Sequence, residues 1–269
     1  LLSRLDTALN EAMIKTDNKK IAVTGHGHNA LAKEERINLI EYAFNNDGFN
    51  IELRPIQDLK EDKKSFLKVL VYIVDRHENS YSKREFFSIL YEKGLVADYN
   101  KKVIDKICSR YRMINHKITA MVTISSDFIS SLDHIRWLGN KLDELEQNPN
   151  IKICFTIKDD VAQQEIQKVI EFAKLIYRFK HYIAISGFTL AQEKLTNLQR
   201  IKPRFIIVDQ DYVEKLYFED KSKVKALQFM ISEAGAKTII AYVDDPKMVT
   251  SLHELDVHYL LSTNYKGEY

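Results

Sequence analysis

Short apolar runs rich in β-branched residues alternate along this chain with longer stretches whose apolar residues recur at helical spacing. Runs of four to eight such residues predict strands, and apolar positions at i, i+3, i+4 and i+7 predict helices. The predicted strands cover residues 49–54, 66–73, 118–124, 151–157, 182–186, 204–208, 237–243 and 257–261. Helices are predicted in most of the intervals between them, so strand–helix alternation is the main feature of the sequence.

The number and order of these elements predict the fold class. Eight strands with intervening helices are typical of an α/β fold, the TIM-like (β/α)8 barrel. The interval 55–65 between the first two strands is polar and too short for the helical crossover that joins parallel strands. We therefore predict that the first strand is antiparallel to the second. In such a barrel the functional side chains gather at the carboxyl ends of the strands, so these positions are the ones to inspect.

The helical stretches also indicate where the barrel domain begins. Helices are predicted over 34–45, 83–93, 99–115, 128–147, 162–179, 191–199, 221–234 and 246–255. A further helix is expected over 1–14, followed by a polar stretch, a short strand over 21–23 and a glycine-rich loop. His26 and His28 lie in that loop, but two histidines without nearby third and fourth ligands do not make a structural metal site. We expect residues 1–33 to be separate from a barrel that covers 34–269.

Composition narrows the functional classes. The 40 basic and 38 acidic residues leave a net charge of +2, so no global field attracts nucleic acid or a membrane. No apolar run reaches the ~20 residues of a membrane span, and there is no signal peptide. We expect a cytoplasmic module, free or as part of a membrane-anchored protein, since the chain opens at Leu1 like a portion of something longer. Cys108 and Cys154 are typical of reduced structural thiols, although the sequence leaves open a buried disulfide between them.

Several segments, in order, resemble motifs of the EAL domain, the bacterial phosphodiesterase family that opens cyclic di-GMP. Residues 54–59 (RPIQDL) are similar to the family's Gln-Pro-Ile-hydrophobic-Asp-Leu, and 86–95 (FFSILYEKGL) to its Phe-Ile-x-x-Ala-Glu-x-x-Gly-Leu helix. Residues 198–209 (LQRIKPRFIIVD) resemble its Leu-x-x-Leu-x-Pro-Asp strand, and 236–244 (AKTIIAYVD) fall where Ile-Ala-Glu-Gly-Val-Glu is usual. The resemblance runs from about residue 34 to the end, and it implies a barrel with a reversed first strand.

The first helix adds a second resemblance. Residues 1–12 (LLSRLDTALNEA) resemble the closing helix of a GGDEF domain, a cyclase-type module commonly fused ahead of an EAL domain. This implies that residues 1–33 are the tail and linker of a GGDEF-like domain in a tandem GGDEF–EAL protein.

The chain departs from the family where EAL enzymes hold two metal ions among carboxylates and one asparagine. Lys68-Val69-Leu70 stands at the Glu-Ala-Leu signature, and Thr123 at the asparagine of the third strand. Two acids of the fourth strand align with Cys154 and Ile157, and the paired aspartates of the fifth strand with Ser186 and Gly187. The lysine of the sixth strand, the glutamate of the seventh and the Gln-Gly of the eighth align with Ile207, Ala241, and Leu261 and Ser262. We therefore expect no metal, no cofactor and no hydrolysis, so that the chain is not an enzyme.

Some acidic residues do remain near the expected strand ends. They are Asp75, Asp127, Asp159, Asp160, Asp209, Asp244 and Asp245. They could form a replacement metal site, but helix capping explains most of them without further assumption. We prefer capping by Asp159 or Asp160 before residue 161, by Asp127 before residue 128 and by Asp245 before Pro246. Asp209 and Asp244 are the two that match acids of the family.

Nucleotide binding without hydrolysis is a separate possibility, because some degenerate EAL domains with a Lys-Val-Leu signature are cyclic di-GMP receptors. Such receptors generally keep an arginine that contacts the ligand phosphate, and that position is Tyr72 here. Tyr72 could stack on a guanine, although an aromatic residue inside a barrel is commoner. The resemblance implies a vestigial pocket formed by Arg54, Lys68, Leu70, Tyr72, Thr123, Ser186, Asp209 and Asp244.

These observations lead to one preferred function and two alternatives. We expect a catalytically inactive EAL domain that serves as a regulatory protein-interaction module in bacterial cyclic di-GMP-related signalling, with another protein or a second copy as partner and no direct contact with nucleic acid. The first alternative is a non-hydrolysing cyclic di-GMP receptor that controls biofilm, adhesion or motility, and an active phosphodiesterase is the weakest. The interval 211–225 falls where EAL domains carry a dimerisation lobe. It could form an interaction surface or an ordinary amphipathic helix, and the sequence leaves both interpretations open.

Overall fold

The computed structural model describes residues 32–59, 66–110, 115–241 and 257–261. The chain divides into two compact units. The smaller one comprises Leu1–Ile51 with Leu70–Val103, and the larger one Glu52–Val69 with Ile104–Tyr269. The expected helix over 1–14, the histidine loop, Asp244, Asp245 and the expected helix over 246–255 lie outside the described residues.

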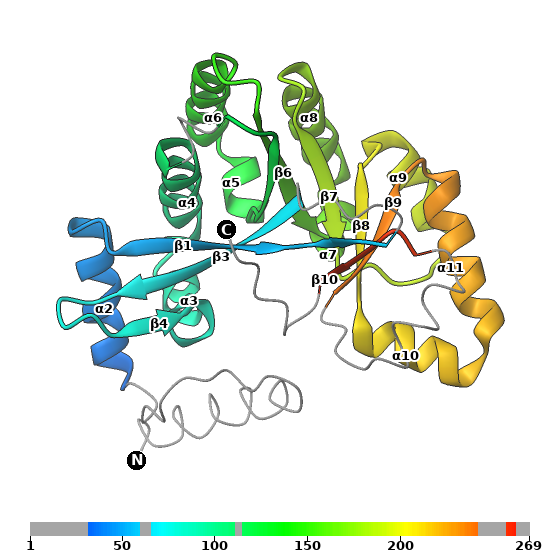
Figure 1. The fold of residues 1–269 in the computed structure, drawn as a ribbon, viewed down its shortest axis with the longest axis horizontal. Coiled ribbons are helices and arrows are strands. Elements are labelled where there is room, and N and C mark those ends of the chain that lie inside the picture. The colour runs from blue at the N-terminus through cyan, green and yellow to red at the C-terminus, as the bar shows by residue number, and fades with distance from the viewer. Residues whose placement is uncertain (1–31, 60–65, 111–114, 242–256, 262–269) are drawn as a thin grey trace. The chain divides into compact units, whose positions relative to one another are not determined.

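A mixed sheet organises the fold, and most of its strands belong to the larger unit (Figure 1). The strands are β1 (Phe49–Pro55), β2 (Gln57–Asp58), β3 (Phe66–Val74), β4 (Ser80–Ser82), β5 (Ile118–Thr123), β6 (Ile151–Lys158), β7 (Tyr182–Ser186), β8 (Phe205–Asp209), β9 (Lys237–Ala241) and β10 (Tyr259–Leu261). They are ordered β1-β3-β5-β6-β7-β8-β9-β10-β2, with β4 paired to β3. Every neighbouring pair from β3 to β10 along this order is parallel.

β1 is antiparallel to β3, as predicted for the first two strands. The Val74 amide at the end of β3 donates to the Gly48 carbonyl just before β1, at 3.0 Å. The Ile56 amide just after β1 donates to the Phe66 carbonyl at the start of β3, at 2.8 Å. The chain then continues into β2, which pairs antiparallel with β10. This one segment therefore joins both edges of the sheet and nearly closes a TIM-like barrel in the larger unit, which confirms the predicted fold class.

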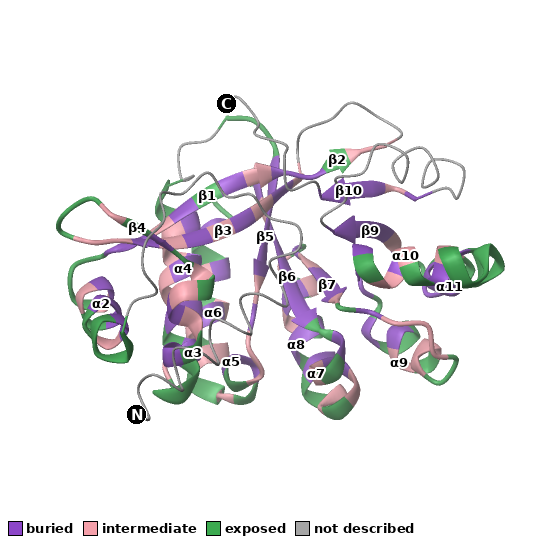
Figure 2. Cartoon of the chain, turned by 90° about the horizontal axis from the view of Figure 1, so that it is seen from below, coloured by how far each residue is buried: buried purple, intermediate pink, exposed green. Residues whose placement is uncertain are grey.

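Helices of the larger unit cover the outside of its strands. They are the end of α4 (Val96–Arg110), α5 (Ser126–Ser130), α6 (Leu132–Leu145), α7 (Asp159–Gln164), α8 (Ile166–Arg178), α9 (Lys194–Ile201), α10 (Gln210–Glu219) and α11 (Lys221–Glu233). Figure 2 shows buried residues along the strands and exposed residues on the outer faces of these helices. One such contact joins Phe155 of β6 to Phe172 of α8, whose ring centroids are 5.7 Å apart.

Two predicted helices are each divided in two. The stretch 128–147 breaks at Ser131, whose hydroxyl accepts from the His134 amide and so caps α6. The stretch 162–179 breaks at Glu165, which separates α7 from α8. Apolar periodicity continues across both breaks, so the pattern alone does not reveal them.

The smaller unit contains α2 (Lys33–Asn45), α3 (Lys83–Glu92), the hairpin β3–β4 and parts of β1 and α4. Its core is aromatic, because the Phe49 ring lies 5.1 Å from Phe44 and 5.5 Å from Tyr99. The Asp75 carboxylate fixes the hairpin turn by accepting from the amides of His77 and Asn79. Asp75 is therefore a turn residue rather than a metal ligand.

Candidate functional site

The carboxyl ends of the barrel strands bring Lys68 and Thr123 together. Lys68 lies on β3 in register with Met121 of β5, two residues before Thr123. The Lys68 Nζ donates to the Thr123 Oγ1 at 3.5 Å, which is a long hydrogen bond. Among the described residues, no carboxylate forms an ion pair with this ammonium. Burial strips water from the amine and lowers the pKa of Lys68 from its usual value of 10.5.

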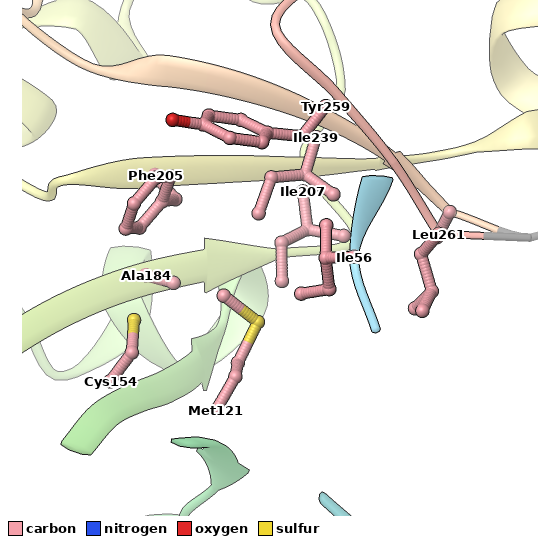
Figure 3. Close-up of a cluster of buried hydrophobic side chains, with 10 residues drawn as sticks. Ile56, Met121, Cys154, Ala184, Phe205, Ile207, Ile239, Tyr259 and Leu261 are labelled. Carbon is pink, nitrogen blue, oxygen red and sulfur yellow. The ribbon is translucent and has the colours of Figure 1, made fainter. Parts of the chain in front are cut away.

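Apolar side chains fill the barrel interior next to this lysine. Ten buried residues form one cluster: Ile56, Met121, Cys154, Ala184, Phe205, Ile207, Ile239, Ala241, Tyr259 and Leu261 (Figure 3). Four of them, Cys154, Ile207, Ala241 and Leu261, stand where the sequence comparison places polar groups of EAL enzymes. Burial raises the pKa of the Cys154 thiol, so this thiol is neutral at physiological pH.

Thr156 is a buried polar residue of β6 that lies beside this apolar cluster. It is in register with Thr123 on one side and with Ala184 on the other. Because side chains alternate along a strand, Thr156 shares its face with Cys154, a member of the cluster. It is completely buried, and its hydroxyl has no hydrogen-bond partner among the residues that the structure describes. A buried hydroxyl in this state carries an uncompensated desolvation cost.

The remaining residues of the expected pocket lie on several different strands. Arg54 pairs with Glu52 of its own strand, at 3.7 Å between Nη2 and Oε1. Ser186 ends β7, and the exposed Asp209 ends β8. Leu70 and Tyr72 belong to the smaller unit, where Tyr72 is in register with Ser82 of β4. Asp244 lies outside the described residues.

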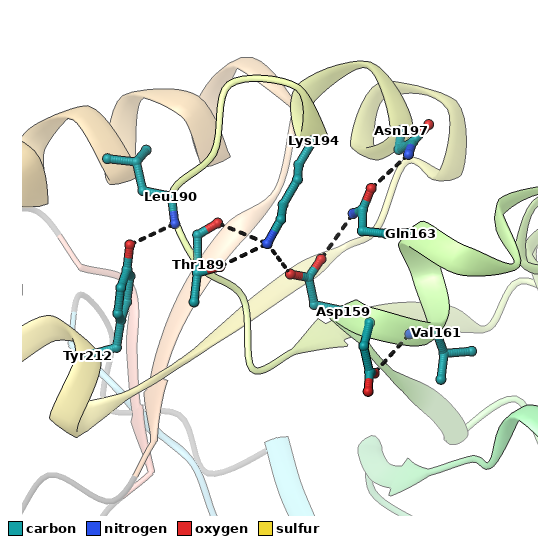
Figure 4. A network of polar contacts seen from close by, with 9 residues as sticks. Asp159, Val161, Gln163, Thr189, Leu190, Lys194, Asn197 and Tyr212 are labelled. Carbon is teal, nitrogen blue, oxygen red and sulfur yellow. Dashed lines mark hydrogen bonds and ion pairs between the residues drawn. The ribbon is translucent and has the colours of Figure 1, made fainter.

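A polar network that the sequence did not reveal surrounds Asp159, just after β6 (Figure 4). The Lys194 Nζ lies 2.5 Å from the Asp159 carboxylate and 2.8 Å from the Thr189 hydroxyl. Gln163 donates to the same carboxylate, and Tyr212 accepts from the Leu190 amide at 2.9 Å. These contacts hold the loop that follows β7. Lys194 is distant from Asp159 in sequence and lies in no motif, so no local signal pairs them.

The capping predictions that fall on described residues are wrong. Asp159 and Asp160 both lie inside α7, whose N-cap residue is Lys158, although the Asp160 carboxylate accepts from the Val161 amide at 2.8 Å. Asp159 is instead the buried partner of Lys194. The prediction for Asp127 is wrong, because Ser125 caps α5 and Asp127 lies inside its first turn. Asp209 precedes α10 as its N-cap residue without a side-chain cap bond.

The groups at positions 68, 154, 207 and 241 do not suit a divalent metal. Mg²⁺ and Mn²⁺ prefer carboxylate and carbonyl oxygens, whereas an ammonium, a neutral thiol and aliphatic side chains stand at these four positions. Within the parts of the chain that the structure covers, no three His, Cys, Asp or Glu residues are grouped to hold a metal ion. Cys108 and Cys154 are both free thiols, so the pair left open by the sequence is not formed. None of the helices described has the length and apolar character needed to cross a membrane.

Comparisons with known proteins agree with this geometry. The EAL domain family model matches residues 37–261. The EAL domain of FimX from Pseudomonas aeruginosa, bound to c-di-GMP, superposes with a TM-score of 0.76 at 19% identity, over 87% of this chain and 96% of that one. The S helix-GGDEF-EAL portion of Vibrio cholerae LapD, bound to c-di-GMP, gives 0.78 at 17% identity, over 97% of this chain and 64% of that one.

A phosphodiesterase named PaMucR, in a c-di-GMP complex, gives a TM-score of 0.72 at 13% identity, over 84% of this chain and 94% of that one. No curated protein matches the chain by sequence. These identities show a shared fold and leave the activity open. The family match covers most of the chain, and the chain belongs to the EAL domain family.

Proposed function

We propose that this chain is a non-hydrolysing EAL domain that acts as a regulatory protein-interaction module in bacterial cyclic di-GMP-related signalling. Residues 34–269 form this domain in the proposal, and residues 1–33 are the tail and linker of a preceding GGDEF-like domain. The family match over 37–261 supports the first boundary.

One observation carries the proposal. Inside the barrel, Lys68, Cys154 and Ala241 stand at aligned positions where a metal-dependent phosphodiesterase needs hard oxygen ligands, and apolar side chains surround them. Without those ligands the site lacks both the Lewis acid and the metal-activated water, each of which contributes several kcal/mol to lowering the barrier. A cation in place of the first ligand also repels an incoming metal ion.

A hydrolysis assay tests this directly. The purified chain is incubated with cyclic di-GMP and either Mg²⁺ or Mn²⁺, and the linear dinucleotide product is measured beside an active EAL phosphodiesterase. We expect no product above the level of buffer alone. Metal-dependent turnover that is lost on adding a chelator would show an enzyme instead.

A second candidate, the non-hydrolysing cyclic di-GMP receptor, is favoured by the charge of Lys68. FimX and LapD are both recorded with c-di-GMP bound, and a receptor fold needs a cation to meet the ligand phosphates. Lys68 is part-buried at the strand ends and has no acidic partner among the residues described. It could take the place of a metal ion toward a phosphate.

Calorimetry separates the receptor from the unliganded module. Cyclic di-GMP is titrated into the chain with Mg²⁺ or with a chelator, and into the variants Lys68→Met and Lys174→Met. Lys174 is exposed on α8 and serves as the matched control. A receptor shows metal-independent heat that Lys68→Met alone abolishes, and an unliganded module shows none with any of the proteins.

An exposed aromatic surface supports an interaction role. Phe218 of α10 and Phe229 of α11 are 80% and 68% exposed, which is unusual for large apolar side chains. The Tyr217 ring lies 5.9 Å from Phe218 and is covered by the Lys221 ammonium at 4.6 Å. Val213 and Leu216 on the opposite side of α10 are buried, so the helix both packs on the barrel and presents an apolar side outward.

A further inference from the structure

Basic side chains gather at the amino ends of the barrel strands, opposite the end at which EAL enzymes work. Five of them stand within three residues of the first residues of β6, β7, β8 and β9, and we call this set the basic mouth. Its members are Lys152, Lys180, Lys202, Arg204 and Lys237. The three residues before β7, and likewise those before β8, contain no acidic residue.

The strand register makes these residues neighbours. β6, β7, β8 and β9 are consecutive in the sheet, and their starts are staggered: β7 begins opposite Cys154, β8 opposite Ala184 and β9 opposite Phe205. Lys152 and Lys180 each lie two residues before a member of the pair Cys154–Tyr182, so they are neighbours, and the Lys237 amide donates to the Arg204 carbonyl at 3.0 Å. Lys152 is two residues before Cys154, and Lys237 is two residues before Ile239, and both of these lie in the interior cluster. Alternation along the strands therefore places Lys152 and Lys237 on the inner face, while Lys180, Lys202 and Arg204 are exposed at the rim.

None of the five residues of the basic mouth forms an ion pair with any residue that the structure describes. The lysines on the helices commonly do, as in Lys141 with Asp105 and Lys223 with Glu219. Desolvation and then the charge of Lys180 lower the pKa of Lys152, while the Glu146 carboxylate opposes this shift, so the like charge of Lys180 has the larger effect.

Aromatic rings position the cations and are themselves covered. The Arg204 guanidinium lies 6.0 Å from the Tyr182 ring and from the Phe205 ring. The Lys237 Nζ donates to the Tyr259 hydroxyl at 3.3 Å. Phe205 and Tyr259 are buried, and they lie at the same end of the interior cluster in Figure 3. Phe205 and Tyr259 are therefore not open platforms on which single-stranded bases could stack.

We propose that the basic mouth binds an acidic segment of a protein partner, an inference that rests on the proposed role as an interaction module. Exposed lysines recognise carboxylates by charge without strict geometry, and Arg204 can hold one carboxylate through two parallel hydrogen bonds. The five cations extend across four neighbouring strands, which suits an extended acidic segment of several residues. Complementary charge also speeds the encounter of the two proteins.

Fluorescence anisotropy with a labelled octaglutamate peptide tests the proposal on the whole chain, with labelled octaglutamine as the neutral peptide. The test variant is Lys180→Gln/Arg204→Gln. The matched control, Lys174→Gln/Lys225→Gln, removes the same charge from exposed helix positions that have no ion pair among the described residues. Thermal unfolding of both variants checks that they fold, and Lys202→Gln is a second test variant at the exposed rim.

We expect octaglutamate to bind the chain, octaglutamine not to bind, and affinity to weaken with salt. The test variant lowers affinity about tenfold or more, which is about 1.4 kcal/mol, and the control less than twofold. Equal losses in both variants, or no binding of octaglutamate, would overturn the proposal. Tighter binding of a uridine dodecamer at the same residues would do so as well, by assigning the mouth to nucleic acid.

The outcome is separable from that of the proposed function. Hydrolysis of cyclic di-GMP would overturn the non-catalytic role and leave binding at the basic mouth intact. Failure of the peptide to bind would remove the acidic partner and leave the hydrolysis result unchanged.

Discussion

The Lys194 ammonium and the Asp159 carboxylate form a short ion pair, with 2.5 Å between Nζ and Oδ2. Their side chains are only 17% and 7% exposed, so both charges are largely removed from water. The pair joins the start of α7 to the start of α9, and through Thr189 it also fixes the loop after β7. A single buried contact therefore organises one side of the strand-end region.

Breaking this pair on one side should destabilise the fold strongly. Lys194→Met leaves the Asp159 carboxylate buried without its cation, which costs about 3 kcal/mol of unfolding free energy. Lys168→Met is the control, because Lys168 is 53% exposed and its pair with Glu165 is worth less than about 1 kcal/mol. Urea unfolding measures both. Equal effects of the two substitutions would show that burial adds nothing to the Lys194 pair.

Lys68→Met should stabilise the protein at neutral pH, on the order of 1 kcal/mol, because methionine fills a similar volume without a desolvated charge. The gain depends on pH, since the lowered pKa lets the folded amine lose its proton before the unfolded one. The wild type therefore recovers stability as pH rises toward 10.5, and the two proteins converge. Urea unfolding at pH 7 and pH 10 checks this, and a gap that widens with pH would contradict it.

Acid should weaken the barrel through His181. Its Nδ1 accepts from the Ile153 amide at 3.0 Å, and desolvation lowers the pKa of this buried imidazole from 6.5 to about 4. Between these pH values the unfolded chain binds a proton that the folded chain does not. The free energy of unfolding should therefore fall by about 3 kcal/mol from pH 7 to pH 4 on account of this residue.

His181→Gln keeps an acceptor for the Ile153 amide and removes the titration. Chemical unfolding at pH 7, 6 and 5 should give a shallower loss of stability for this variant than for the wild type. His77→Gln, at an exposed turn position, is the control and should follow the wild type. Parallel pH profiles for wild type and His181→Gln would refute the assignment.

Thr156→Val should raise the unfolding free energy by about 1 kcal/mol, because a methyl group of similar size replaces a hydroxyl without a described partner. Thr123→Val is the contrasting variant, since its hydroxyl accepts from Lys68 and its loss should destabilise. Thermal or urea unfolding compares the two. Destabilisation by Thr156→Val would mean that this hydroxyl is satisfied by water.

The fold was predictable because its signals are local and repeated. Strand-length apolar runs, helix-length periodicity and the short interval after residue 54 predict the reversed strand that the Ile56 and Val74 hydrogen bonds confirm. The breaks at Ser131 and Glu165 were missed, because the apolar pattern crosses both. The two-residue strand β2 was missed as well, since its pairing with β10 depends on closure of the sheet.

The site was less accessible to sequence reasoning. The proximity of Lys68 and Thr123 follows from strand register, which the motif spacing anticipated. The pairing of Asp159 with Lys194 depends on how two helices after neighbouring strands face each other, and no spacing rule encodes that. The role of Asp127 was mistaken because Ser125, two residues earlier, is an equally good cap by type.

The interior cluster also limits which substitutions the protein can tolerate. Cys154, Ile207 and Ala241 belong to the same buried cluster, and none of the three is more than 5% exposed. Placing a lysine or a carboxylate at any single one buries an unpaired charge, at a cost of several kcal/mol against a stability of about 5–15 kcal/mol. Polar groups introduced here one at a time would therefore each lower stability before any metal ion could compensate. Substitutions on the outer surface carry no such cost, because side chains there remain in water.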